Sequence, residues 1–326
     1  MSENSYKLQD DSYESDSSKM VEIKNATKRF GGEVGVAELS CDIPRGSIFG
    51  LVGANGAGKS TLMRMIAGVY RADEGEVLVE GKPVFDNPEA KENIAFVPDE
   101  LYFVPGATLA RMSRMYESTR KNFDKEMLFD LADKLNLSLN KPVSQFSKGM
   151  RRQAATILAL SCKPDIILFD ETFDGLDPIV RGVVKRLVCD SILERQATAV
   201  ITSHSLRELE DTCDQLALLH QGGLVLQSEV SDLKTSLFKV QIAFARPFTR
   251  ADIESVGVEI HAYSQQGSVA NIIAGGDRAE AAQKLNVLGP AILEILPLTL
   301  EEVFNYEMKA RGYDFDKVFG EGESDK

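Results

Sequence analysis

The clearest indication of the fold is one stretch of sequence, Ser47-Ile-Phe-Gly-Leu-Val-Gly53-Ala-Asn-Gly-Ala-Gly58-Lys59-Ser60-Thr61. Its first half is an apolar run typical of a buried strand, and helix-forming residues follow from Lys59. A strand, a glycine-rich turn and a helix in this order open an α/β nucleotide-binding fold. The turn matches the pattern G-x-x-x-x-G-K-[ST], whose glycines let the backbone N–H groups face phosphate oxygens. We therefore predict a phosphate-binding loop.

The residues of this loop have distinct expected roles. Lys59 should contact the β- and γ-phosphates of a nucleotide, and Ser60 should ligate Mg²⁺. The dipole of the helix that begins at Lys59 adds attraction for an anion. The alternative, a chance glycine-rich turn, leaves the flanking strand and helix unexplained. The predicted nucleotide-binding residues are Gly53, Asn55, Gly56, Ala57, Gly58, Lys59, Ser60 and Thr61.

A second motif places two carboxylates at the end of another strand. Ile166-Ile-Leu-Phe169 is wholly apolar, as expected of a strand covered on both faces, and Asp170-Glu171 follows it. Because the carboxyl ends of parallel strands meet at one edge of a sheet, both carboxylates are expected near the phosphate loop. We predict that Asp170 holds Mg²⁺ and that Glu171 polarises the attacking water as general base.

The remaining pattern predicts a parallel α/β core and a smaller C-terminal unit. For the core we expect strands at 20–24, 39–43 and 197–202, helices within 106–139 and 180–193, and a hairpin at Gly222-Gly223. From about residue 238, strands at 238–244, 258–263, 269–274 and 292–296 are separated by helices at 249–256 and 278–288. This βαββαβ order is typical of ferredoxin-like folds, so we expect a small α+β accessory domain and a last helix at 300–310.

The composition limits what the chain can bind. Its 326 residues carry a formal net charge of −13, which would repel nucleic acid. The ends, residues 1–18 and 311–326, are expected to be disordered acidic tails. No apolar run approaches the about 18 residues of a membrane span, and the amino terminus lacks the apolar segment of a signal peptide. Four scattered cysteines, without C-x-x-C spacing, predict buried reduced thiols.

With these motifs in place, residues 21–233 resemble an ABC-transporter ATPase. The signature loop of that family, usually Leu-Ser-Gly-Gly-Gln, stands here as Phe146-Ser147-Lys148-Gly149-Met150. The resemblance implies that Ser147 and Gly149 contact the γ-phosphate of ATP held by an opposite subunit. It therefore implies a head-to-tail dimer with ATP at the interface. Taken alone, Ser147 would be only the N-cap of the helix that follows it.

Further positions match the family pattern. Asp177, in Asp174-Gly-Leu-Asp177, resembles the D-loop residue that crosses to the other subunit, and His204 resembles the switch histidine at the γ-phosphate. Phe30 occupies the position of the aromatic residue that stacks on adenine, with a core or hairpin aromatic as the alternative. The resemblance implies ATP and Mg²⁺ as cofactors and Glu171 and His204 as catalytic residues.

The chain also departs from the family pattern. Asp99, in Val97-Pro98-Asp99-Glu100, stands where the family usually has Gln, and we expect its oxygen to meet Mg²⁺ or the attacking water. Thr172-Phe173 replaces the Pro-Thr that usually follows the catalytic glutamate, and the signature loop lacks its Gln and one Gly. Because the lysine, Mg²⁺ and glutamate positions are intact, we expect hydrolysis to be retained.

The resemblance implies the fold of a P-loop NTPase ABC cassette, which is a RecA-like core plus a helical subdomain. We expect the ATPase domain to span residues 19–237, with the helical subdomain at about 101–161, and the accessory domain to span 238–310. The apolar segment Tyr102-Phe103-Val104-Pro105 is either a contact for a membrane partner or part of the packing inside the subdomain.

Four segments are similar to YtrB-like exporter cassettes of Gram-positive bacteria: Phe96-Val-Pro-Asp99-Glu100, Ser147-Lys-Gly149-Met150, Asp174-Gly-Leu-Asp177 and Leu298-Thr-Leu-Glu-Glu-Val-Phe304. That resemblance implies an ATP-hydrolysing subunit that drives export through a separate transmembrane permease and pairs with a second ABC ATPase subunit. Its expected place is the cytoplasmic face of the cell membrane, without nucleic acid. The alternatives are a soluble ABC-type ATPase without a membrane partner and a subunit that binds ATP without hydrolysing it.

Overall fold

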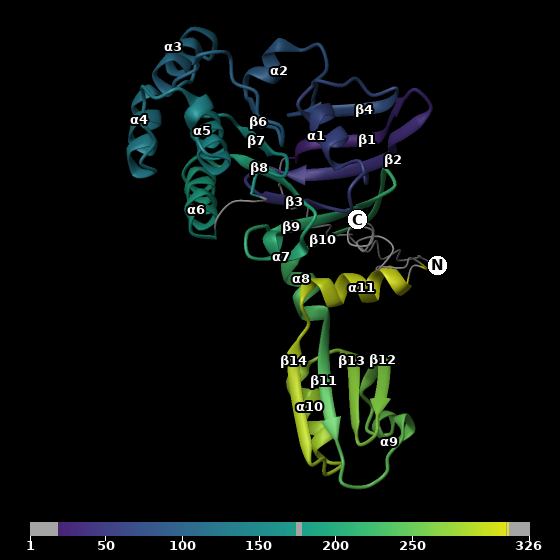
Figure 1. Cartoon of the computed structure of the whole chain (residues 1–326). Coiled ribbons are helices and arrows are strands. Elements are labelled where there is room, and N and C mark those ends of the chain that lie inside the picture. The colour runs from purple at the N-terminus through teal and green to yellow at the C-terminus, as the bar shows by residue number, and fades with distance from the viewer. Residues whose placement is uncertain (1–18, 174–177, 311, 313–326) are drawn as a thin grey trace, which may run out of the picture.

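A six-stranded sheet forms the centre of the molecule (Figure 1). The computed structural model describes residues 19–173, 178–310 and 312. The strands lie in the order β10 (Gly223–Glu229), β9 (Gln215–His220), β3 (Ile48–Val52), β8 (Thr198–Ser203), β7 (Ile166–Phe169) and β6 (Ile94–Val97). The pairs from β9 to β6 are parallel, and β10 is antiparallel to β9. Strands β3, β7 and β8 are buried at every position, which explains their nearly continuous apolar sequence.

A four-stranded antiparallel sheet packs against the central sheet. Its strands lie in the order β2 (Glu33–Pro44), β1 (Lys19–Phe30), β4 (Glu74–Val79) and β5 (Lys82–Pro83). The two sheets share a core with helix α1 (Lys59–Ile66), in which Met20, Phe49 and Leu62 are buried. The sequence patterns predicted only parts of β1 and β2. Register shifts near Asn25, whose φ is 47°, break the alternation that would reveal the full strands.

Helices contribute most of a second large core with the central sheet. They are α3 (Leu109–Thr119), α4 (Lys125–Lys134), α5 (Lys148–Ser161), α6 (Pro178–Arg195) and α7 (Leu206–Glu210), with a 3-10 turn at Val143–Gln145. The short helix α2 (Pro88–Glu92) instead places Ala90 in the core of the first two sheets. The predicted helical stretch at 106–139 contains α3 and α4. Figure 1 shows α3, α4 and α5 as a lobe beside the sheets.

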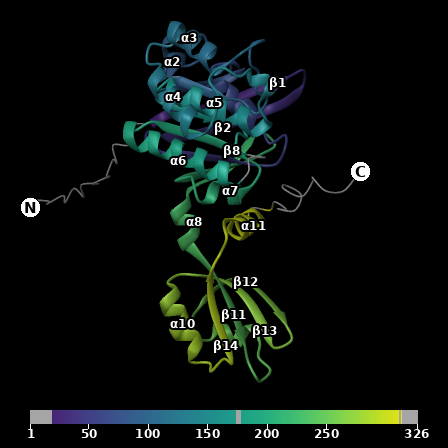
Figure 2. The same cartoon turned by 60° about the vertical axis from the view of Figure 1, so that its left-hand side comes forward.

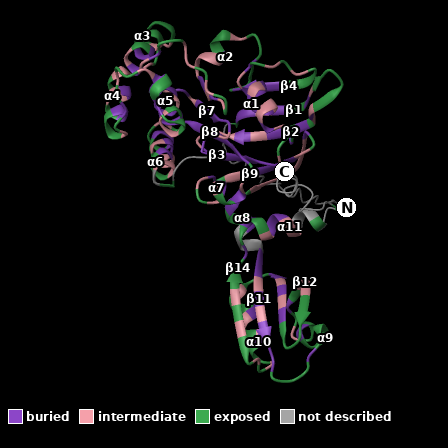
Figure 3. Cartoon of the chain, viewed as in Figure 1, coloured by how far each residue is buried: buried purple, intermediate pink, exposed green. Residues whose placement is uncertain are grey.

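A third sheet lies apart from the other two (Figures 1 and 2). Its strands are all antiparallel, in the order β12 (Glu259–Gln266), β13 (Val269–Gly275), β11 (Leu237–Ala243) and β14 (Ile292–Pro297). Helices α9 (Arg250–Glu254) and α10 (Arg278–Asn286) connect these strands, and a separate small core includes Phe238, Ile272 and Leu285. Figure 3 shows that β12 and β14 carry mostly exposed and intermediate residues.

Two helices join this third sheet to the rest of the molecule. Helix α8 (Val230–Ser236) leads into β11, and α11 (Leu300–Ala310) follows β14 at the bounds that the sequence predicted. Leu300, Val303 and Phe304 of α11 belong to the large core under the central sheet, not to the core of the third sheet. Phe238 pairs with Pro297, so the chain leaves and returns through adjacent strand ends, which we call the neck.

The four cysteines are free thiols, as expected. Cys41, Cys162 and Cys213 are buried and Cys189 is half-buried. Burial raises the pKa of the Cys162 thiol to about 11 and that of Cys41 to about 12. Among the helices of the described residues, none combines the length and apolar character needed to cross a membrane.

Candidate functional site

The predicted phosphate loop lies between the buried strand β3 and helix α1. Gly58 has a φ of 100°, and a Cβ at this position would lie 2.3 Å from the carbonyl oxygen of Gly35. A Cβ on Gly53 would lie 2.5 Å from the carbonyl oxygen of Leu219. Only glycine fits these two positions, and the resulting turn brings backbone N–H groups and the start of α1 to one place.

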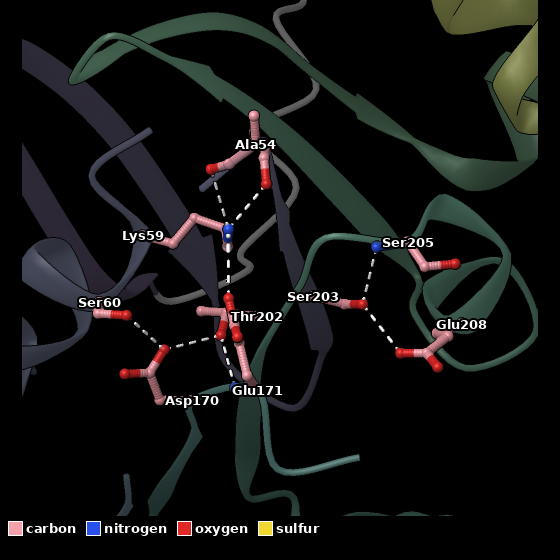
Figure 4. A network of polar contacts seen from close by, with 10 residues as sticks. Ala54, Lys59, Ser60, Asp170, Glu171, Thr202, Ser203, Ser205 and Glu208 are labelled. Carbon is pink, nitrogen blue, oxygen red and sulfur yellow. Dashed lines mark hydrogen bonds and ion pairs between the residues drawn. The ribbon is translucent and has the colours of Figure 1, made fainter. Parts of the chain in front are cut away.

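The amino group of Lys59 joins the phosphate loop to the end of β7 (Figure 4). The side chain is only 4% exposed. Its Nζ donates hydrogen bonds to the carbonyl oxygens of Gly53 at 2.7 Å and Ala54 at 3.2 Å, and lies 3.4 Å from Oε1 of Glu171. These carbonyls and this carboxylate are its partners within the described part of the chain, so the buried cation is well placed to exchange them for phosphate oxygens.

Asp170 follows β7 and is fully buried. Its Oδ1 accepts hydrogen bonds from Ser60 Oγ at 3.0 Å and Thr202 Oγ1 at 2.9 Å, while its Oδ2 has no partner among the described residues. Burial raises the pKa of this carboxyl, against the lowering effect of the Thr202 and Ser60 hydrogen bonds. An unpartnered carboxylate oxygen beside a serine hydroxyl suits Mg²⁺, which prefers oxygen ligands. Two of the three predicted metal ligands, Ser60 and Asp170, thus come together.

Glu171 adopts a backbone conformation that is unusual for its residue type. Its φ is 47°, in the left-handed region. Its N–H donates to Thr202 Oγ1 at 2.8 Å, and its carbonyl oxygen accepts from Arg152 at 2.6 Å. No sequence motif points to Thr202 or Arg152, yet both hold the residue that is predicted as general base.

The loop after β8 is tied to helices α6 and α7. His204 directly follows β8 and is exposed. Before it, Ser203 Oγ donates to Glu208 Oε2 at 2.9 Å and accepts from the N–H of Ser205 at 3.0 Å (Figure 4). Glu208 also pairs with Arg181 of α6 at 2.8 Å. The backbone on both sides of His204 is therefore anchored.

Asp99 lies beside Glu171 but is turned to another partner than predicted. Among the described residues, its carboxylate pairs with Arg152, whose Nη2 lies 2.7 Å from Asp99 Oδ1. Arg152 is only 4% exposed, whereas the side chain of Asp99 is 46% exposed. Asp99 is therefore ion-paired with α5, the helix that follows the signature loop, whereas the hydroxyl of Ser60 donates to Asp170.

The other predicted residues occupy the rim of the site or lie elsewhere. Phe30 ends β1 at a hairpin, is 42% exposed and packs edge-on against Tyr70 with ring centroids 5.2 Å apart. Ser147 is exposed and caps α5 by accepting from the N–H of Met150 at 3.2 Å, and Gly149 is half-buried in the first turn. Asp177 lies outside the described residues.

Comparisons with known proteins show the family to which this chain belongs. A family model described as ABC transporter matches residues 36–174. The chain is 30% identical over 285 residues to the ABC transporter ATP-binding protein YtrB of Bacillus subtilis (strain 168), covering 87% of this chain and 97% of that protein. It is 33% identical over 230 residues to the Nod factor export ATP-binding protein I of Rhizobium etli, covering 68% of this chain and 72% of that protein.

Solved structures show the same fold. A structure described as the ATP-binding subunit of an ABC transporter matches with a TM-score of 0.62 at 24% identity, covering 66% of this chain and 92% of that chain. The fold of the central part is thus the α/β ABC cassette, to which the antiparallel sheet at the C-terminal end is an addition. With its cassette fold, its phosphate loop and a relative matched over nearly its full length, the chain belongs to the ABC transporter ATP-binding proteins, which bind and hydrolyse ATP.

Proposed function

We propose that this chain drives export through a separate transmembrane permease by hydrolysing MgATP at the interface with a second ABC ATPase subunit. The observation that carries the proposal is the cluster of Lys59, Ser60, Asp170 and Glu171 at one edge of the central sheet. The relative from Rhizobium etli is named as an export protein, which supports the direction of transport. The cytoplasmic face of the membrane is the corresponding location.

Each residue of the cluster has a chemical role in this proposal. Lys59 binds the β- and γ-phosphates, and Ser60 with Asp170 holds Mg²⁺, which when bound offsets the negative charge of the phosphates. Glu171 accepts a proton from the attacking water as general base. The remaining phosphate-loop residues donate backbone N–H groups, His204 contacts the γ-phosphate, and Phe30 stacks on adenine.

The second subunit completes the site. The exposed Ser147 and the neighbouring Gly149 would reach the ATP bound by the opposite subunit, and Asp177 would cross the same interface. The position of Ser147 at the exposed start of α5 supports this, because the helix N-terminus adds attraction for a phosphate group. Binding of two ATP molecules would close the dimer and hydrolysis would open it.

The permease would dock on the lobe of helices. A cavity of about 150 Å³ lies there between Phe96, Leu101, Met112 and their neighbours, and Tyr102, which also lines it, is 83% exposed. Phe103 and Val104 pack against the core, so only part of the predicted apolar segment is open to a partner. A soluble ABC-type ATPase without a membrane partner is the alternative.

The domain organisation is part of the proposal. We propose an ATPase domain at residues 19–237, with the helical subdomain at about 101–161, and an accessory domain at 238–310. The last helix of this accessory range, α11, packs on the core of the ATPase domain. The strands lie side by side in the order β12-β13-β11-β14. Along the chain, α9 follows β11 and α10 follows β13, and this arrangement supports a ferredoxin-like fold for the accessory sheet. We infer a regulatory or dimer-stabilising role for it.

The test of the ATPase mechanism is the variant E171Q. It keeps the size of the side chain but removes the proton acceptor, so it should bind MgATP, hydrolyse it very slowly and accumulate as a closed dimer. Size-exclusion chromatography with light scattering, with and without MgATP, measures this, and candidate second cassettes are included. A variant that hydrolyses ATP at the rate of the unmodified chain would contradict the role of Glu171.

A second measurement tests the membrane partner. The tagged full chain is purified from detergent-solubilised membranes, and the ATPase rate of the complex is compared with that of the isolated chain. A stoichiometric multi-span membrane protein that alters the ATPase rate is the expected result. Recovery with soluble partners alone would favour the alternative.

A further inference from the structure

Arg152 has a buried guanidinium group whose two terminal nitrogens donate to different acceptors. It lies on α5, five residues after the N-cap Ser147, and is 4% exposed. Its Nη1 donates to the carbonyl oxygen of Glu171 at 2.6 Å, and its Nη2 donates to Asp99 Oδ1 at 2.7 Å. A buried guanidinium needs such partners, because an unpaired charge in the interior is strongly destabilising.

The strand register brings these partners together. Val97 of β6 pairs with Phe169 of β7, so Asp99 and Glu171 each stand two residues beyond an aligned pair of parallel strands. The N–H of Glu171 is held on the other side by Thr202 Oγ1. The peptide groups flanking the left-handed Glu171 are thus both fixed, one by Thr202 and one by Arg152.

We propose that Arg152 is a positioning residue for ATP hydrolysis, and that Asp99 acts on Glu171 through Arg152 and not as a ligand of Mg²⁺. The inference rests on the proposed function, because positioning Glu171 matters only if Glu171 is the general base. Arg152 keeps the Glu171 backbone in its left-handed conformation, which aims the carboxylate at the site of Lys59. Asp99 neutralises the buried guanidinium and sets its orientation.

The chemistry of arginine explains why this residue type is needed. Its planar group carries donors that point in different directions, so one side chain can bridge a carbonyl and a carboxylate. Lysine keeps the charge but has a single donor atom. We therefore expect R152K to retain part of the function and R152Q to lose most of it.

The experiment compares the variants R152Q, R152K and D99A with E171Q in the full-length chain. In R152Q, kcat should fall by about ten- to a hundredfold, because small displacements of a catalytic group have effects of this size. The affinity for MgATP, measured by calorimetry, should stay within about twofold, since the hydrogen bonds of the Arg152 side chain among the described residues go to Glu171 and Asp99 and not to the phosphate loop. R151Q is the matched control, because Arg151 is the exposed neighbour of Arg152 and should tolerate the change.

A double-mutant cycle separates the two roles that Asp99 could have. If Asp99 acts through Arg152, D99A should lower kcat in the unmodified chain but change it by less than about twofold when R152Q is already present. The Mg²⁺ concentration for half-maximal ATPase activity should be the same in D99A as in the unmodified chain. A direct metal ligand would give additive losses and a higher Mg²⁺ requirement, and that result overturns the inference for Asp99.

The outcomes for Arg152 also separate this inference from the proposed function. If E171Q is inactive and R152Q turns over normally, Arg152 does not position Glu171 and the inference is wrong. If E171Q itself is active, the general base is misassigned and the proposed function fails first. If R152Q does not fold, D99A carries the test, because Asp99 is at the half-exposed end of the pair and Arg152 keeps its second acceptor, the carbonyl oxygen of Glu171. A normal kcat in D99A then overturns the inference.

Discussion

At the residue scale, Asp170 is a carboxyl group whose burial has a cost in stability. Burial raises the pKa of this carboxyl above its usual value, so the folded state binds the proton more tightly than the unfolded state does. The favourable contribution of Asp170 is therefore fully present below the unfolded pKa and is lost as the pH rises through the folded pKa. Without nucleotide or metal, burial of the charged form of Asp170 is therefore destabilising.

This sign gives a prediction for D170N. The variant keeps an oxygen for Ser60 and Thr202 but removes the charge. Its free energy of unfolding at pH 7 should therefore rise by roughly 1 kcal/mol, which raises the unfolding temperature, while ATPase activity is lost. Calorimetric unfolding of the nucleotide-free protein measures the first effect. The control S60A leaves the charge and removes one hydrogen-bond donor, so it should unfold at a lower temperature. A destabilised D170N would show that the charge is better compensated than the contacts indicate.

The residues of the site could be predicted from sequence only where they belong to a contiguous motif. Lys59 and Ser60 stand in one loop and Asp170 and Glu171 in one strand end, so spacing alone indicated them. Thr202 and Arg152 were missed because their contacts depend on strand register and on the direction of a helix. A signal did exist for Arg152, which lies on the same buried face of α5 as Thr156 and so needed a partner.

Helix α5 carries the prediction at the element scale. Its N-cap Ser147 has one role in this chain, which is to accept the N–H of Met150, and a second proposed role at the ATP of the opposite subunit. S147D should preserve the cap, because Asp is as good an N-cap as Ser, but it would place a negative charge next to the γ-phosphate. The protein should therefore unfold at nearly its normal temperature, yet no closed dimer should form when S147D is combined with E171Q.

The control for this prediction is S147A, which loses the cap and should be destabilised by about 1 kcal/mol. Thermal unfolding measures the stability of both variants, and light scattering with MgATP measures dimer closure. If the combination of S147D and E171Q closes as readily as E171Q alone, Ser147 does not face the phosphates of a partner.

Elements were predicted well where one physical signal dominates. The strand at Ile166–Phe169 is continuously apolar, and the helix at Leu300–Ala310 has a clear apolar face, so both were found at their observed bounds. The short strand β4 was not predicted, because its first three residues are exposed and its last three are buried, without alternation. The packing of α11 against α7 was not predictable, since nothing in the sequence of a helix says which of two cores it joins.

At the scale of the whole molecule, the accessory sheet is inserted between α8 and α11, both of which contact the ATPase body. Lys239 pairs with Leu296 across the neck. Replacing residues 240–295 with an Asn-Gly turn should therefore leave a folded protein that binds MgATP normally, because such a turn closes an antiparallel pair. Thermal unfolding and nucleotide titration measure the result.

The matched comparison is a chain that ends after Leu237. It lacks α11, so Leu300, Val303 and Phe304 no longer cover α7 and α8, and each missing side chain should lower the stability by about 2 kcal/mol. We expect this shorter chain to be much less stable than the chain with the turn. Equal stability of the two would show that α11 is not part of the ATPase core.

The pairing of strands in the third sheet and the packing of α11 determine how the molecule would respond to a protease. The exposed turn at Gly267-Ser268 is the kind of site where a protease cuts first. A single cut there would leave β11 and β12 on the amino-terminal fragment, and β13, β14 and α11 on the other. The two fragments would still share a sheet and a buried helix, so they would migrate as one species until a denaturing gel separated them.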